Sequence, residues 1–215
     1  MVPKQALVLV CAVTNMLSAA VTINEFHYDN AGGDKNEFIE IVLTDPLSMS
    51  PDDIDIFFYN GGDGTPYKEF NLSDFDAHGI LSDSNAYYSK HVTGIQNGGP
   101  DGFAVTYNNT VFEFISYEGS FSATSGPAAG MTSTDILVYE ATSTPPNSSL
   151  QRQCFSDTWV LTEGSNTRGQ VNTGCTPGPA PKPTPVPEPV PVPVPGACLL
   201  TCMGLGLIRA TRQRF

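Results

Sequence analysis

The sequence predicts an all-β fold of the sandwich or barrel type, and three observations support this. Short segments with apolar residues at every second position recur along residues 21–174, between clusters of Gly, Asp and Asn. No segment keeps a helical period. The stretch is about 150 residues long, enough for one domain with a substantial core. Short strands without helices bury their apolar residues by packing sheet against sheet.

Each expected strand is a short alternating segment bounded by turn residues. Glycine-rich residues 30–34 join the first two strands. Asn108 and Asn109 tolerate positive φ and therefore suit a tight hairpin turn between two later strands. The expected strands cover residues 21–28, 37–43, 54–59, 67–72, 87–92, 103–107, 110–117 and 159–161.

Residues 1–20 have the organisation of a secretory signal peptide. Lys4 precedes an apolar stretch at residues 6–13, and residues 18–20 are the small side chains that a signal peptidase reads. A buried helix of a cytosolic protein would continue its amphipathic period, whereas strand-like alternation follows here. We therefore expect cleavage after Ala20 and export of the protein.

The carboxyl-terminal end has three parts in the order of a sorting tail. A proline-rich linker, residues 176–195, favours an extended polyproline conformation of about 3 Å per residue. An apolar run at residues 196–208 enters the bilayer, and a basic end stays on its cytoplasmic side. The proline-flanked motif is Pro187, Glu188 and Pro189, and the basic end is Arg209, Arg212 and Arg214.

This tail resembles the PEP-CTERM signal of bacterial exported proteins, which exosortase-type transpeptidases process. The resemblance implies transient membrane contact through residues 196–215. A plain membrane anchor after a proline-rich spacer is the alternative. The tail departs from the usual pattern because its prolines continue to Pro195 and because Cys198 and Cys202, whose role stays open, lie in the apolar run.

The expected domain is strongly acidic. Residues 21–180 hold five Lys and Arg against twenty-one Asp and Glu, a net charge of −16. Such a surface repels phosphate backbones, and no basic patch with interleaved aromatic residues occurs. Nucleic acid is therefore excluded as a direct partner.

Of five cysteines, only Cys154 and Cys175 belong to the expected domain. In an exported protein such a pair most often forms a disulfide, and this one closes a loop of about twenty residues, worth roughly 3 kcal/mol. Metal binding or catalysis by so few thiols is less favoured. We expect Cα atoms within about 7 Å of each other.

Several blocks of residues occur along the domain in a characteristic order. They are I-N-E-F-H-Y-D-N at 23–30, E-F-I-E-I at 37–41, N-G-G-P-D-G at 97–102, I-S-Y-E-G at 115–119, G-P-A-A-G-M-T-S-T-D at 126–135, S-L-Q-R at 149–152, Trp159 and G-x-x-N at 169–172. With these blocks, residues 21–175 resemble the lamin tail domain family in its bacterial, exported form. The resemblance implies an immunoglobulin-like β-sandwich, and it implies surface or binding modules rather than one activity.

The domain carries no catalytic motif. His27, His78 and His91 lie outside any H-E-x-x-H or G-x-S-x-G pattern. Neighbouring carboxylates such as Glu37 and Glu40 suit acid–base work, but twenty-one acids form such pairs by chance. We therefore assign no catalytic residue and expect a protein that is not an enzyme.

Calcium is the one cofactor that the sequence suggests. Asp29, Asn30, Asp34 and Glu37 lie within nine residues on a glycine-rich turn, and Ca²⁺ prefers such oxygen ligands. Their spacing differs from that of an EF-hand loop. In the alternative reading, Asp29 and Asn30 cap a hairpin and Glu37 is a charge at a sheet edge.

These observations together predict a secreted, non-catalytic β-sandwich module at the cell surface or in the extracellular matrix. Its expected partners are extracellular proteins or polysaccharide, with an exosortase-type enzyme for processing. The alternative is an accessory domain or hydrolase that uses the acidic loops, with or without calcium. A pocket with convergent carboxylates and aromatic residues would favour that alternative, and a plain convex sandwich would favour the module.

The tail makes the first testable prediction. The apolar run of thirteen residues is well short of the roughly twenty that span a bilayer, so it suits a transient stop better than a permanent anchor. Protein recovered from its natural host should therefore lack residues 198–215 by intact-mass measurement. Changing Glu188 should leave full-length precursor in the membrane. A mature species that still carries the final Arg-Gln-Arg-Phe would show a simple anchor instead.

Overall fold

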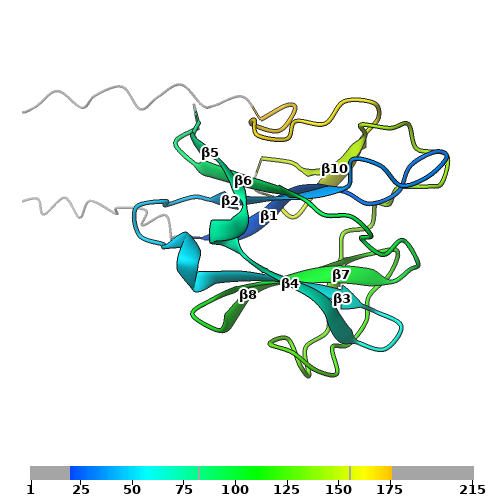
Figure 1. The fold of residues 1–215 in the computed structure, drawn as a ribbon, viewed down its shortest axis with the longest axis horizontal. Coiled ribbons are helices and arrows are strands. Elements are labelled where there is room, and N and C mark those ends of the chain that lie inside the picture. Colours follow the sequence, from blue (N-terminus) through cyan, green and yellow to red (C-terminus); the bar gives the residue numbers. More distant parts are fainter. Residues whose placement is uncertain (1–19, 82, 155, 176–215) are drawn as a thin grey trace, which may run out of the picture. The chain divides into compact units, whose positions relative to one another are not determined.

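The structure is a computed structural model that describes residues 20–81, 83–154 and 156–175. These residues form eleven strands and two three-residue 3₁₀ helices, η1 (Pro51–Asp53) and η2 (Leu72–Asp74). The strands make two sheets whose apolar faces pack on each other, so the predicted all-β sandwich is confirmed (Figure 1). No helix among the described residues is long and apolar enough to cross a membrane. The expected signal peptide, linker and sorting motif, including Pro187, Glu188, Pro189, Arg209, Arg212 and Arg214, lie outside the described residues.

The first sheet has six antiparallel strands in the order β11-β10-β1-β2-β6-β5. Chain neighbours β1 and β2 form its centre, while β10 and β11 return from the end of the domain to one side. The strands are β1 (Val21–His27), β2 (Phe38–Leu43), β5 (Asp76–Ile80), β6 (Ala86–His91), β10 (Ser149–Arg152) and β11 (Trp159–Thr162).

The second sheet has five strands in the order β4-β3-β7-β8-β9. All neighbours are antiparallel except β8 and β9, which pair in parallel through two residues. The hairpin between β7 and β8 turns at Asn108 and Asn109, with φ of 49° and 61°, as the sequence predicts. The strands are β3 (Ile54–Asn60), β4 (Thr65–Asn71), β7 (Asp101–Tyr107), β8 (Thr110–Tyr117) and β9 (Thr134–Asp135).

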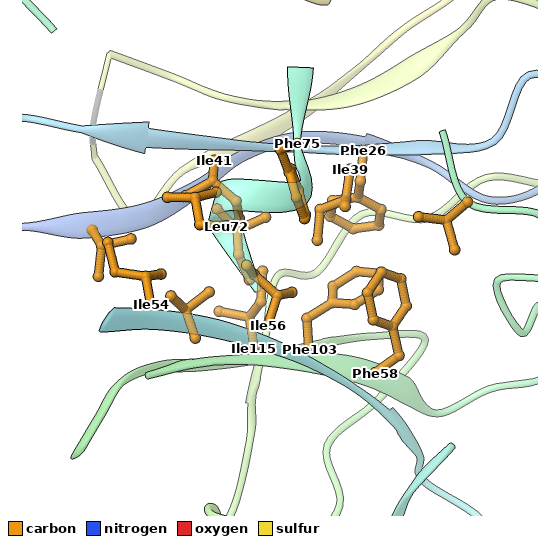
Figure 2. Packing of buried hydrophobic residues seen from close by; sticks show 14 of the residues in the cluster. Phe26, Ile39, Ile41, Ile54, Ile56, Phe58, Leu72, Phe75, Phe103 and Ile115 are labelled. Atoms are coloured by element: carbon orange, nitrogen blue, oxygen red, sulfur yellow. The ribbon is translucent and has the colours of Figure 1, made fainter. Parts of the chain in front are cut away.

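Aromatic and branched aliphatic side chains fill the space between the sheets (Figure 2). Phe26 of the first sheet packs on Phe103 of the second with ring centroids 4.9 Å apart, and Phe103 packs equally close to Phe58. A β-bulge between Ile23 and Glu25 shifts the pairing with β2, so the inward residues change from odd to even positions. That shift places Phe26 and Tyr28 in the core and turns Glu25 outward.

The outer face of the second sheet carries a smaller apolar cluster. The chain between β8 and β9 folds back over this face, which gives the exposed side of the sheet its own cover. Phe121 of this cover packs edge-on against Phe114 with ring centroids 5.3 Å apart. The cluster consists of Tyr59, Ala104, Phe114, Phe121, Ala123 and Ala128.

Most predicted strands are present within one or two residues of their expected ends. The sequence analysis did not predict β5, β9 or β10. β5 is an edge strand with mostly exposed residues and a glycine next to its last residue, so it shows no apolar alternation. β9 has two residues, and β10 is buried on both faces, so neither has a period to detect.

The predicted disulfide between Cys154 and Cys175 is confirmed, with Cα atoms 5.0 Å apart. It ties the last described residues to the chain just after β10. Those residues run along the outer face of the first sheet, so the bond fixes the end of a covering segment.

Removal of the disulfide should destabilise the domain measurably. In a chain-entropy model, opening a loop of 21 residues costs about 3 kcal/mol of unfolding free energy. The double variant Cys154→Ser/Cys175→Ser should therefore unfold at lower urea concentration than the oxidised parent, with an equal or larger m-value because its unfolded chain is less restricted. Reduced parent protein is the matched control and should resemble the variant. Equal midpoints for oxidised parent and variant would contradict the prediction.

Candidate functional site

Loops from both sheets meet at the end of the sandwich where β1 finishes. They are the β1–β2 loop, the β3–β4 turn, the β6–β7 loop, the turn after β8 and the segment between β9 and β10. Tyr28, just after β1, stacks on Tyr117 at the end of β8 with ring centroids 4.2 Å apart. The stacked rings thus join the two sheets at this end and position the loops above them.

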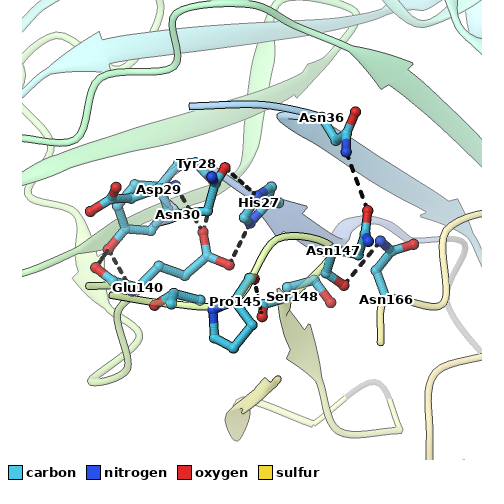
Figure 3. Close-up of polar contacts among 12 residues, drawn as sticks. His27, Tyr28, Asp29, Asn30, Asn36, Glu140, Pro145, Asn147, Ser148 and Asn166 are labelled. Atoms are coloured by element: carbon cyan, nitrogen blue, oxygen red, sulfur yellow. Dashed lines mark hydrogen bonds and ion pairs between the residues drawn. The ribbon is translucent and has the colours of Figure 1, made fainter. Parts of the chain in front are cut away.

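Glu140 organises the loops. Its carboxylate lies 2.7 Å from His27 Nδ1 and accepts hydrogen bonds from the backbone N–H groups of Tyr28 and Asp29 (Figure 3). Burial alone lowers the pKa of His27, but the hydrogen bond and charge of Glu140 outweigh it and leave that pKa raised. Both Glu140 oxygens therefore hold the loop in place.

Tyr28 joins a second carboxylate to the same network. Its hydroxyl donates to Glu118 Oε1 at 2.7 Å and accepts from the backbone N–H of Glu140 at 2.8 Å. Glu118 adopts a left-handed φ of 61°. A Cβ at Gly99 would lie only 2.5 Å from Glu118 Cβ, so this close approach requires glycine.

A pocket of about 440 Å³ opens among these groups. Asp29 and Glu140 are buried in it, while Glu118 and Asn97 are exposed at its rim. Tyr139 also lies at the rim and is 60% exposed. The lining residues are Asp29, Asn97, Glu118, Tyr139, Glu140, Ala141 and Thr142.

A neighbouring pocket of about 340 Å³ shares Asn97 with the first. Asp101, the first residue of β7, lies in it and accepts a hydrogen bond from the N–H of Gly61 at 3.0 Å. Burial, opposed by this bond and assisted by the charge of Glu118, raises the pKa of Asp101 to about 6. Asp101 therefore takes up a proton more readily than an ordinary carboxylate.

The four residues proposed for calcium divide into two groups. Asn30 Oδ1 accepts from the N–H of Lys35, and the Glu37 oxygens accept from the N–H groups of Gly94 and Ile95 at 2.7 Å. The carboxylates of Asp29 and Asp34 lie beside each other. Nowhere among residues 20–81, 83–154 and 156–175 do three His, Cys, Asp or Glu side chains converge as metal ligands. Calcium at these residues stays a prediction.

The alternative reading of Glu37 as a charge at a sheet edge does not agree with the structure. Glu37 is buried just before β2, and β2 lies between β1 and β6 rather than at an edge. Its two backbone hydrogen bonds position the β6–β7 loop, which supplies Asn97 to the pocket. Glu37 therefore supports the site without facing it.

A second polar cluster lies on the outer face of the first sheet. Glu25 and Glu40 are directly paired across β1 and β2, and both are fully buried. Thr167 donates its N–H and hydroxyl to Glu25, and the N–H of Gly169 donates to Glu40. These carboxylates hold the final segment of the domain against the sheet.

Sequence reasoning found part of the site. Asp29 was a candidate, and the quoted blocks contain Asn97, Asp101 and Glu118 without assigning them a role. Glu140 and Tyr139 were missed because they belong to no predicted strand and to none of the quoted blocks. Their position depends on a contact with residues more than a hundred positions earlier.

Comparison with known proteins gives no match to a family model, a curated protein or a solved structure.

The pairing of Glu40 with Glu25 predicts an unusual pH dependence of the stability of the domain. Burial, followed by the charge of Glu25, raises the pKa of Glu40 from 4.5 to about 8. A carboxyl with a higher pKa in the folded state binds a proton on folding, so its contribution to stability falls between pH 4.5 and about 8. The melting temperature of Glu40→Gln should therefore fall less between pH 5 and pH 8 than that of the parent.

Exposed Glu69 on β4 provides the matched control. Glu69→Gln should keep the parent's pH dependence. Equal pH dependence of the parent and Glu40→Gln would show that Glu40 titrates normally.

Proposed function

We propose that this protein is an exported, non-catalytic β-sandwich module that binds an extracellular protein or polysaccharide at the cell surface or in the matrix. The observation that carries the proposal is the pocket of about 440 Å³ formed by loops from both sheets. Loops on a rigid sandwich commonly carry binding residues, because the sheets fix the loop ends. Asp29 is held in place by the backbone bonds that Glu140 accepts.

The position of the described chain ends supports a display role. β1 runs from Val21 towards the pocket, so Val21 lies at the opposite end of the sandwich. β10 is antiparallel to β1, so the chain leaving Arg152 towards Cys154 runs to that same end. Cys175 is bonded there. A module attached through its carboxyl-terminal side would direct the pocket away from the attachment point.

The resemblance to the lamin tail domain family supports the same role and an immunoglobulin-like sandwich. Three quoted blocks, residues 23–30, 97–102 and 115–119, contribute Asp29, Asn97 and Glu118 to the pocket. Blocks far apart in sequence thus meet at one place. The signal peptide and PEP-CTERM-like tail extend the proposal to secretion, exosortase-type processing and transient membrane contact through residues 196–215.

A hydrolase or hydrolase accessory role is the second candidate. The pocket brings together carboxylates and an exposed tyrosine, which is the feature expected of this alternative rather than of a plain convex module, so the pocket by itself favours the second candidate. Asp101, with its pKa of about 6, has the property of a general acid. Against it, both oxygens of Glu140 and one oxygen of Glu118 already accept hydrogen bonds. We therefore favour binding.

The binding proposal is tested by incubating the purified full chain with extracellular matrix from its natural host. The protein should sediment with that matrix, and Glu118→Gln should weaken the association several-fold. Asp101→Asn should retain binding, and the parent should release no reducing sugar or peptide from the matrix. Product release that is lost in Asp101→Asn would establish the hydrolase alternative, and failure to sediment would refute the binding role.

A further inference from the structure

We infer that the 440 Å³ pocket receives the cationic side chain of a partner protein, with Arg as the best fit. This inference rests on the proposed binding function and names the partner chemistry. Asp29 would pair with the guanidinium group inside the pocket, while Glu118 and Tyr139 would hold the incoming chain at the rim.

The buried carboxylate of Asp29 is the feature that points to a cation bound in the pocket. Asp29 is 5% exposed, its carboxylate is hydrogen-bonded to the carboxyl of Asp34 and to the N–H of Asn30, and no Lys, Arg or His is among the residues that line the pocket. Burial and the neighbouring carboxylates of Asp34 and Glu140 raise its pKa, against a smaller opposing effect from the N–H of Asn30. A buried carboxylate without a charge partner is costly, and a cation that enters the pocket removes that cost.

The other carboxylates are already engaged, which argues for an organic cation over a metal ion. Glu140 accepts from three groups, and Glu118 Oε1 accepts from the Tyr28 hydroxyl. Calcium needs six to eight oxygen ligands at about 2.3–2.6 Å. The described residues bring together no three carboxylate, imidazole or thiolate ligands. The neighbouring carboxylates of Asp29 and Asp34 instead match the paired N–H donors of a guanidinium group.

The rim favours the same ligand. Asp34 lies beside Asp29 and accepts from Asn97 Nδ2 at 3.3 Å, so a planar guanidinium has two carboxylates within one region. Tyr139 offers an exposed aromatic ring, and a cation over such a ring gains about 0.5–2 kcal/mol. A neutral sugar would leave the Asp29 charge uncompensated. A basic protein segment compensates it and reaches the buried carboxylate with a long side chain.

The charge of the whole domain agrees with a basic partner. Five Lys and Arg stand against twenty-one Asp and Glu over residues 21–180. Such an excess attracts a cationic protein and accelerates its association at low salt. The pocket then supplies the specific contact within this general attraction.

The test titrates the purified full chain with the blocked tripeptide Gly-Arg-Gly, followed by NMR. The matched probe Gly-citrulline-Gly has the same shape without the charge. The arginine peptide should shift resonances of residues 29, 97 and 139, and the citrulline peptide should bind about tenfold more weakly or not at all. Asp29→Asn should weaken arginine binding at least about tenfold, and Tyr139→Ala several-fold.

Asp52→Asn is the control, because Asp52 is exposed in η1, outside both pockets. It should bind the arginine peptide like the parent. Glu118→Gln, at the exposed rim, keeps the test valid if Asp29→Asn fails to fold, and it should also weaken binding.

Three outcomes would overturn the inference. Equal binding of both peptides would remove the charge requirement. Tighter binding of chitosan oligomers than of the arginine peptide would assign the pocket to an amino sugar. A rise in melting temperature with millimolar calcium, lost in Asp34→Ala, would assign it to the metal. Each result leaves the sedimentation test of the proposed function unaffected, so the two failures are distinguishable.

Discussion

The contact of Phe26 with the opposite sheet is the interaction on which the rest of the structure depends. Its ring packs within 4.9 Å to 5.6 Å of the rings of Phe103, Trp159 and Tyr117, so one side chain joins strands of both sheets. The bulge in β1 directs this ring inward and brings Tyr28 onto Tyr117. Because Tyr28 also bonds to Glu118 and Glu140, the core determines where the pocket residues lie.

The same bulge also places a buried carboxyl group on the other face of the first sheet. It turns Glu25 outward opposite Glu40, and two adjacent carboxyl groups that are fully buried need hydrogen-bond donors. The segment after β11 supplies them from Thr167 and Gly169, and the disulfide at Cys175 anchors that segment. These buried carboxyl groups favour one particular path of the covering segment, because its hydrogen-bond donors must lie at fixed positions.

Alternation and turn chemistry were sufficient to predict most strands and the hairpin at Asn108, and the two cysteines of an exported domain were sufficient to predict the disulfide. They were insufficient where burial is two-sided or pairing is distant: β10 has no exposed face, and β9 needs only a two-residue contact. For the site, local sequence identified Asp29 as a polar loop residue. It did not reveal that Glu140, 111 residues later, binds its N–H, because that contact arises only when the sheets close.

The two ends of the sandwich hold the chain in different ways. At the end with Val21 and Cys154, the chain is tied by a covalent bond. At the other end, Asp29 is buried beside Asp34, and this arrangement costs stability without improving the core. The fold tolerates that cost because Glu140 holds the loop through three hydrogen bonds. In our inference, an arginine of a partner protein would supply the positive charge that the carboxylates of Asp29 and Asp34 lack, since no basic residue lines the pocket.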